Sequence, residues 1–314
     1  MFLRHGSHAL LLTLAMFGCV PIELPAQDTQ PASPYSAPSV VCRITDARID
    51  EASGLAASRR NPGLYYTHND SAGKPHVYAI DRAGRIRATI RLIGAANLDW
   101  EDVAIAPGTT AGEFDVCVAD IGDNKSRRER VTIYRFPEPE IGAATAGGNI
   151  DLRPTIYRCK YENGPRNAEG FAVDPRSGDG FIFSKRKDGR CNVYLWTAPW
   201  KADKTTTLKK ISSLRFPAGL PLSSMVTGAD ISPDGLKLAT RAYAGGWEWR
   251  LPANANKFAE IFKQTPAAIE LAVEQQGEAV CYTCDGNALL TISEGVPTAV
   301  NEVRAENVDE PLLP

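Results

Sequence analysis

WEDVAIAP, at residues 100–107, is one of five copies of a strand-like pattern that decides the fold of this chain. The other copies are EASGLAAS (51–58), AEGFAVDP (168–175), VTGADISP (226–233) and AIELAVEQ (268–275). Aligned on Gly54, Asp102, Gly170, Gly228 and Glu270, they are separated by 48, 68, 58 and 42 residues. Repeats of this spacing, closed by Gly- or Pro-rich turns, are typical of β-propeller blades. The pattern predicts an all-β propeller with five blades. Six blades are the alternative, because the two longest spacings leave room for a degenerate unit.

Turn signals divide each repeat into short strands, and no long segment has helical periodicity. The expected strands are 52–58, 63–68, 76–81 and 85–93 in the first blade, and 101–106, 114–120, 131–136 and 150–161 in the second. The third blade has 169–174, 180–185, 191–197 and 207–216, and the fourth has 227–232, 236–242, 246–251 and 258–263. The fifth has 269–274, 278–283, 287–293 and 298–304. We expect one extra strand, Val40–Ile49, to complete the last blade and close the ring, since open sheet edges invite aggregation.

The N-terminal residues 1–26 are expected to be a signal peptide, because the apolar run Ala9–Phe17 is too short to span a bilayer. Lipid attachment at Cys19 is the alternative, since MFGC (16–19) loosely matches a bacterial lipobox. Residues 27–39 form a flexible Pro-rich spacer, and residues 40–314 form a single propeller domain without a transmembrane segment. The sequence therefore predicts a secreted or periplasmic protein, with a lipid anchor to the cell envelope as the alternative.

The charges are nearly balanced, with 35 Lys and Arg against 37 Asp and Glu, so nothing favours nucleic acid or an anionic membrane as a partner. Six cysteines follow Cys19, and an even number in an exported protein suggests disulfides, with buried thiols as the alternative. We expect Cys42 to lie near the strands that carry Cys281 or Cys284. A Ser-His-Asp triad is not expected, because no G-x-S-x-G motif is present.

The polar residues are expected to gather on one face of the propeller, because the innermost strands start on the same face as the loops that follow the second strands. Calcium takes six to eight oxygen ligands, and Asp, Glu and Asn dominate these positions. Carboxylates that cap backbone turns or remain solvated are the alternative. The expected metal ligands, with Ca²⁺ as the tentative ion, are Asp70, Asp99, Glu101, Asp102, Asp120, Asp123 and Asn124.

The same face is expected to bind a ligand through cationic and aromatic side chains. Lysine and arginine would attract a phosphate or carboxylate, although these residues also suit an ordinary solvated loop. Trp100 suits a binding platform or packing between blades. The expected ligand-binding residues are His68, Asn69, Trp100, Lys185, Arg186 and Lys187.

A family resemblance rests on EASGLAAS with NPGLYYTHNDS, NLDWEDVA, ADIGDN with RRERVTIYRFPEP, and RNAEGFAVD with FIFSKR. Over about residues 45–200 the chain resembles a group of secreted bacterial β-propeller proteins near the phytase-like and gluconolactonase-type propellers. Gluconolactonase-type propellers hold a divalent metal on the axis, and Glu51 resembles one of their ligands in position. The phytases bind calcium between acidic loops, and Asp120, Asp123 and Asn124 are similar in kind.

Two functions remain open on this basis. The first is an exported, monomeric propeller whose Ca²⁺-loaded acidic face binds a small anionic ligand or another protein. The second is a metal-dependent hydrolase of phosphoesters or lactones, in which Glu51 or Glu169 acts as the catalytic base and Lys185, Arg186 and Lys187 steer the anion. Carboxylates that converge beside a pocket would favour the enzyme. Carboxylates that are each bound to turn amides would favour the binding protein.

Overall fold

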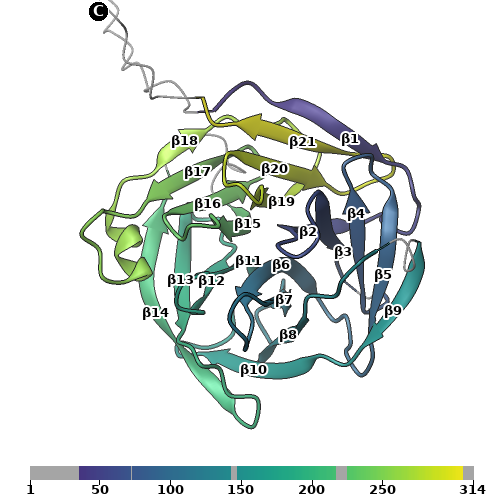
Figure 1. Cartoon of the computed structure of the whole chain (residues 1–314). Coiled ribbons are helices and arrows are strands. Elements are labelled where there is room, and N and C mark those ends of the chain that lie inside the picture. The colour runs from purple at the N-terminus through teal and green to yellow at the C-terminus, as the bar shows by residue number, and fades with distance from the viewer. Residues whose placement is uncertain (1–34, 72, 143–146, 217–224, 307–314) are drawn as a thin grey trace, which may run out of the picture. The chain divides into compact units, whose positions relative to one another are not determined.

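The computed structural model describes residues 35–71, 73–142, 147–216 and 225–306. The chain divides into two compact units, residues 1–32 and 33–314, and every described residue belongs to the second unit. The predicted signal peptide, Cys19 and most of the spacer lie outside the described residues. The second unit is a ring of β-sheets around a central axis (Figure 1). No helix in its described part is both long and apolar enough to cross a membrane.

Five innermost strands surround the axis, and each lies beside the next, so that they form a closed ring (Figure 1). They are β2 (Ala52–Ala57), β6 (Trp100–Pro107), β11 (Ala168–Val173), β15 (Val226–Ile231) and β19 (Gly277–Tyr282). The all-β propeller is confirmed, and the described residues form five blades.

The other strands follow outward from the axis in each blade. The first blade has β3 (Leu64–Asn69), β4 (His76–Asp81) and β5 (Ile86–Leu92), and the second has β7 (Phe114–Asp120), β8 (Val131–Pro137) and β10 (Thr155–Tyr161). The third has β12 (Gly180–Ser184), β13 (Arg190–Trp196) and β14 (Thr205–Arg215), and the fourth has β16 (Lys237–Ala242), β17 (Gly245–Arg250) and β18 (Ala267–Ile269). The fifth has β20 (Ala288–Ser293), β21 (Thr298–Arg304) and β1 (Ser39–Ile44).

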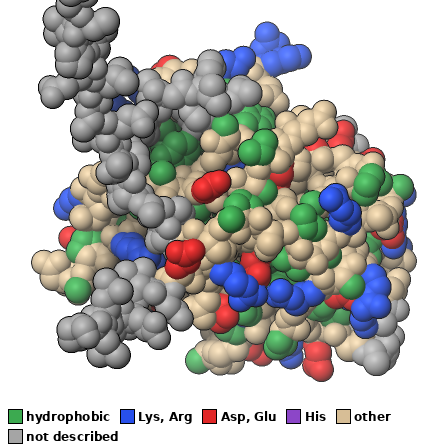
Figure 2. All heavy atoms as spheres, turned by 90° about the horizontal axis from the view of Figure 1, so that it is seen from above, with side chains coloured by type: hydrophobic (Ala, Val, Ile, Leu, Met, Phe, Trp, Pro, Cys, Tyr) green, Lys and Arg blue, Asp and Glu red, His purple; other side chains and the backbone are tan. Residues whose placement is uncertain are grey.

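The ring is closed by the N-terminal strand, as predicted. β1 pairs antiparallel with β21 and is the outermost strand of the fifth blade, so the two ends of the described chain share one sheet. Figure 2, which views the unit from its rim, shows acidic and basic side chains interspersed on this side. This mixture agrees with the small net charge of −2.

The predicted strand 150–161 is in fact two strands on different blades. β9 (Gly148–Leu152) pairs in parallel with β5 of the first blade, whereas β10 completes the second blade. Pro154 lies between them and has no N–H to continue a ladder. β10 also pairs in parallel with β14, which joins the second and third blades into one eight-stranded sheet. The long spacing of 68 residues between the second and third copies therefore reflects a strand that pairs with the first blade, and not a sixth blade.

The fifth copy of the repeat was placed too early in the chain. Residues 258–263, expected as a strand, form a 3-10 helix with Phe258 and Ile261 buried, and the AIELAVEQ segment only contributes β18. The innermost strand of the fifth blade is β19, in which every residue is buried. The Glu-Leu-Ala-Val run at 270–273 imitates the Glu-Gly-Phe-Ala-Val run of β11 at 169–173, so a short match in sequence was taken for the repeat.

The cysteines do not form the expected disulfides. All six cysteines of the described residues are free thiols, and Cys117, Cys159, Cys191 and Cys281 are buried. Burial raises the pKa of each of these four thiols. The alternative of buried thiols therefore fits these four residues.

Asp102 links three blades through one carboxylate. Its Oδ2 accepts hydrogen bonds from the backbone N–H of Phe171 (2.9 Å) on β11 and of Ala229 (3.2 Å) on β15, while Oδ1 accepts from Val103 (2.9 Å). The side chain is fully buried. Because β6 and β15 belong to blades that are not neighbours, the carboxylate reaches across the axis. Asp102 was expected as a metal ligand, but both of its oxygens are used by the backbone.

Replacing Asp102 by alanine should strongly destabilise the propeller. Three buried N–H groups would lose their acceptor, and each unsatisfied group costs about 1–3 kcal/mol. We expect the free energy of unfolding in urea to fall by about 3 kcal/mol or more, and Asp102→Asn, which keeps one acceptor oxygen, to lie between the two proteins. A fall of less than about 0.5 kcal/mol for Asp102→Ala would contradict this role.

Candidate functional site

The innermost strands carry an extra residue near their start, relative to the second strand of the blade. In β6 the residues on either side of Glu101 pair with consecutive residues of β7, so Glu101 bulges from the ladder. Glu169 in β11, Thr227 in β15 and Glu278 in β19 occupy the same position. Such a bulge re-aims a side chain. Three glutamates from three blades thus stand at equivalent positions around the axis, at the end where the innermost strands start, and this end is here called the entrance of the channel.

Three carboxylates converge at this entrance. Asp70, Asp99 and Glu101, here called the carboxylate cluster, each offer an oxygen within 4.8 Å of the others. Two oxygens that bind the same Ca²⁺ at about 2.4 Å can be at most about 4.8 Å apart. Asp70 Oδ1 is shut off from solvent and has no hydrogen-bond partner in the described structure. The cluster therefore has the spacing and the unsatisfied oxygen of a cation site.

Neighbouring residues hold the cluster in place. Asn97 Nδ2 donates to the carbonyl oxygens of Asn69 (3.1 Å) and Asp70, which anchors the loop after β3 to the approach to β6. Gly122 packs so closely that a Cβ there would collide with the carboxylates of Glu101 and Asp99. Neither Asn97 nor Gly122 was predicted, because their roles depend on contacts between blades.

Burial and mutual repulsion disturb the ionisation of these acids. Burial, followed by repulsion from Asp99, Glu169 and other carboxylates, raises the pKa of Asp70 to about 7. Burial and repulsion from Glu169 raise the pKa of Glu278 to about 8, although Lys185 opposes this shift. The same two causes raise the pKa of Glu101 well above its usual range. Without a bound cation, several carboxyl groups at the entrance therefore remain protonated near neutral pH.

Lys185 neutralises one of the three glutamates. Its Nζ lies 2.5 Å from Glu169 Oε2, donates to the hydroxyl of Tyr243 (2.6 Å) and lies 4.7 Å from the centre of the Tyr243 ring. The other Glu169 oxygen accepts from Asn167 Nδ2 (3.3 Å). Glu169, expected as a catalytic base, is therefore already paired. Lys185 lies at the entrance, as expected for a ligand-binding residue.

The remaining expected metal ligands organise the loop after β7. Asp120 Oδ1 is 2.7 Å from Arg128, and Asp123 Oδ2 accepts from the Arg128 backbone N–H (2.7 Å). Asn124 Oδ1 accepts from Asn167 Nδ2 (3.2 Å). Asp120, Asp123 and Asn124 thus lie outside the cluster: the two aspartates contact Arg128 of the same loop, and Asn124 contacts Asn167, which precedes β11. Arg128 was missed, since its distance in sequence from Asp120 carries no motif.

His68 and Trp100 belong to the core between the first two blades. Both side chains are fully buried, with ring centres 5.6 Å apart in an edge-to-face contact. Burial lowers the pKa of His68 to about 4, so the ring is neutral at physiological pH. Trp100 also contacts Tyr134, with ring centres 5.8 Å apart. This burial fits the packing alternative and leaves neither residue open to a ligand.

The other predicted site residues do not belong to the cluster, although the Glu51 carbonyl oxygen accepts from the backbone N–H of Asp70 (2.9 Å). Asn69 Nδ2 donates to Asp50 Oδ1 (2.8 Å), and Arg186 pairs with Asp188 at 2.5 Å. Lys187 and Glu51 are exposed. Glu278, in contrast, was missed because the fifth repeat was misplaced. Correct alignment on β19 would have put this glutamate beside Glu101 and Glu169.

Comparisons with known proteins support the fold. No family model matches the chain, and no curated protein matches it in sequence. Among solved structures it is similar to the crystal structure of the soluble aldose sugar dehydrogenase from Escherichia coli in the apo form, with a TM-score of 0.50 and 12% identity over 86% of this chain and 99% of that chain. At this identity the similarity shows the fold alone. The resemblance to secreted bacterial propellers is confirmed only as far as the propeller.

Removing the charge of Glu278 should change how stability depends on pH. In metal-free protein the folded state keeps the Glu278 proton up to about pH 8, whereas the unfolded chain releases it near its ordinary pKa of 4.5. Stability should therefore fall as pH rises from 6 to 8, by up to about 1.4 kcal/mol per pH unit from this group. We expect Glu278→Gln, measured by urea unfolding with EDTA present, to lose this part of the slope. An unchanged slope would show that Glu278 is ionised in the folded protein.

Proposed function

We propose that the entrance of the channel binds a divalent cation, best fitted by Ca²⁺, and that the cation-loaded entrance binds a small anionic ligand. The observation that supports this most directly is the convergence of Asp70, Asp99 and Glu101 within 4.8 Å. Within the described residues, the lysine and arginine nearest the cluster pair with Glu169 and Asp120 instead. A cation is the simplest way to relieve the repulsion among the three carboxylates.

The chemistry of the donors favours calcium. The cluster offers only carboxylate oxygens, which hard cations prefer, and His68 is directed into the core between blades. Backbone oxygens and water would complete six to eight ligands. An entrance lined by ionised carboxylates repels anions, so binding of an anionic ligand should depend on the cation. Lys185 would then add a second positive charge beside it.

Calcium should bind to and stabilise the protein. A cation bound only by the folded state stabilises it by about 2.7 kcal/mol at a hundredfold excess over Kd. We expect Ca²⁺ to raise the melting temperature, and Asp99→Asn and Glu101→Gln to weaken Ca²⁺ binding by at least tenfold in calorimetric titrations.

Asp188→Asn is the matched control, since it removes an exposed carboxylate from a loop on the same face. The control should bind Ca²⁺ like the unmodified protein. A melting curve that Ca²⁺ and EDTA leave unchanged would rule out the metal site, and equal losses in Asp188→Asn would show a nonspecific charge effect.

Hydrolysis is a second candidate function, favoured by Glu278. A carboxyl group with a pKa of about 8 beside a cation site can give or take a proton near neutral pH. Glu51 is exposed and Glu169 is paired with Lys185, so Glu278 replaces both as the candidate acid or base. Among the carboxylates expected at this face, Asp70, Asp99 and Glu101 converge, whereas Asp102 and Asp123 accept backbone hydrogen bonds.

A substrate screen separates the two functions. If the protein is a hydrolase, p-nitrophenyl phosphate or a δ-lactone should be hydrolysed with Ca²⁺ and not with EDTA. Glu278→Gln should then lower kcat by about a hundredfold or more, while Ca²⁺ affinity stays within about threefold, because the residue lies outside the cluster. Activity that survives in Glu278→Gln would exclude this acid or base. Ligand binding without any EDTA-sensitive hydrolysis would leave the binding function alone.

A further inference from the structure

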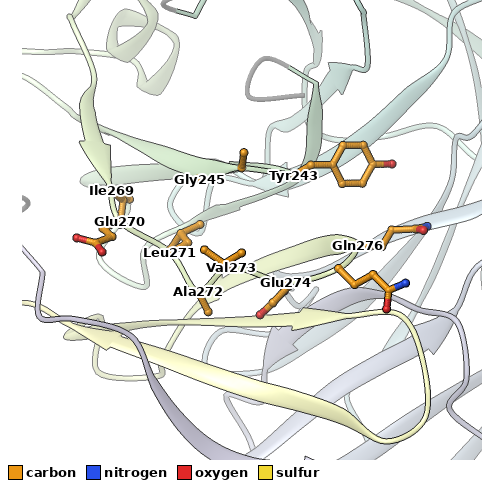
Figure 3. A pocket seen from close by; sticks show the side chains of 11 residues that line it. Tyr243, Gly245, Ile269, Glu270, Leu271, Ala272, Val273, Glu274 and Gln276 are labelled. Carbon is orange, nitrogen blue, oxygen red and sulfur yellow. The ribbon is translucent and has the colours of Figure 1, made fainter. Parts of the chain in front are cut away.

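A cavity of 720 Å³ lies between the fourth and fifth blades (Figure 3). One wall is the turn 243–245 between β16 and β17, and the other is the segment 269–276 that leads from β18 to β19. This volume lies in the range of about 300–1,000 Å³ that is usual for small-molecule sites. The cavity is therefore sized for a small ligand and not for a protein surface.

The lining is mainly apolar, with its buried acid already paired. Ile269, Leu271, Ala272 and Val273 contribute hydrophobic side chains, and the Val273 side chain is fully exposed. Glu274 lies 3.0 Å from Arg241 and accepts hydrogen bonds from Thr291 (2.8 Å) and Asn301 (2.6 Å). An apolar group can therefore enter without stripping a free carboxylate of its partners.

The cavity borders the entrance through Tyr243, which lines the cavity and contacts Lys185. In Figure 3 the Tyr243 ring points away from Ile269 and Glu270 at the other end. The Tyr243 hydroxyl accepts from Lys185, whose Nζ pairs with Glu169. Gln276 also lines the cavity and stands two residues before Glu278. One molecule can thus contact both the charged entrance and the apolar cavity.

We propose that the cavity binds the apolar part of an amphipathic anion, with the charged group held at the cation-loaded entrance near Lys185. The ligand class is a phosphate or carboxylate that carries an alkyl or acyl chain of medium length. This inference rests on the proposed function for the charged group. The proposal for the apolar chain rests on the cavity alone, so the binding of the apolar chain and of the charged group can be tested separately.

The test is a series of monomeric n-alkyl phosphates from methyl to octyl, titrated calorimetrically with Ca²⁺ present. Each methylene that enters the cavity should strengthen binding about fourfold, which corresponds to about 0.8 kcal/mol. The gain should stop when the cavity is full. Equal affinities for methyl and octyl phosphate, or no binding of any member, would overturn the proposal.

Three variants locate the apolar group. Ala272→Trp should fill the cavity and abolish the dependence on chain length, and Val273→Ser should weaken it with little risk to folding, because Val273 is fully exposed. Leu236→Ser is the control, since Leu236 is an exposed leucine in the β15–β16 turn and does not line the cavity. A chain-length dependence that is unchanged in folded Val273→Ser and Ala272→Trp would place the apolar group elsewhere.

Two further measurements distinguish a failure of the metal site from a failure of the cavity, and a lipid from a soluble molecule as the source of the ligand. Chain-length dependence that persists with EDTA, at unchanged affinity, would support the cavity and contradict the metal. Ca²⁺-dependent affinity without chain-length dependence would support the metal site and contradict the cavity. Cosedimentation with phosphatidylcholine vesicles containing phosphatidic acid tests a lipid as the source of the same chemistry. Vesicle binding that Ala272→Trp abolishes supports the proposal with a lipid ligand, whereas binding that it leaves intact contradicts the cavity as the lipid site.

Discussion

The position of the entrance depends on the hydrogen bonds of Asp102. Its carboxylate holds β6, β11 and β15 at fixed distances through their backbone N–H groups. Asp230 plays the same role, since its Oδ2 accepts a hydrogen bond from the Tyr282 backbone N–H (2.8 Å) and so joins β15 to β19. Two carboxylates thus link four of the five inner strands, and the Ser53 hydroxyl links β2 to β6 by donating to the Glu101 carbonyl oxygen (2.9 Å). The bulge at Glu101 places a second carboxylate next to Asp102, directed to the entrance, so structure and candidate chemistry share one strand.

The charge balance at the entrance is the physical reason for proposing a cation there. One lysine serves three glutamates in equivalent positions, and two aspartates from flanking loops add to their charge. Protons can relieve this repulsion at the cost of ionisation, as the raised pKa values of Asp70 and Glu278 show. A divalent ion relieves it at neutral pH and at the same time makes the face attractive to anions. The two proposed functions, binding and hydrolysis, would thus use the same electrostatic arrangement.

The sequence predicted most of the ring, because most inner strands carry the same recognisable pattern of residues, closed by a Gly- or Pro-rich turn. Strand direction also placed Asp70, Asp99 and Glu101 on one face, and these three do converge. Strand direction could not show that Asp102 and Asp120 lie outside this cluster, because their oxygens bind partners in other strands and in a loop. Glu278 was missed for a local reason, since the Glu-Leu-Ala-Val run at 270–273 imitated an inner strand. The burial of His68 and Trp100 likewise depends on how two blades meet.

The parallel pairing of β5 with β9 and of β10 with β14 divides the ring into unequal parts. The second and third blades share one sheet through the backbone hydrogen bonds of their outer strands, whereas β9, which follows β8 in the chain, adds a fifth strand to the sheet of the first blade. Among the described strands, the fourth and fifth blades form separate sheets that meet through side chains. Local opening should be easier at that seam, with faster amide hydrogen exchange, than between the second and third blades, which share a sheet. The apolar cavity lies at this seam, so a guest molecule can be admitted without breaking a single sheet ladder.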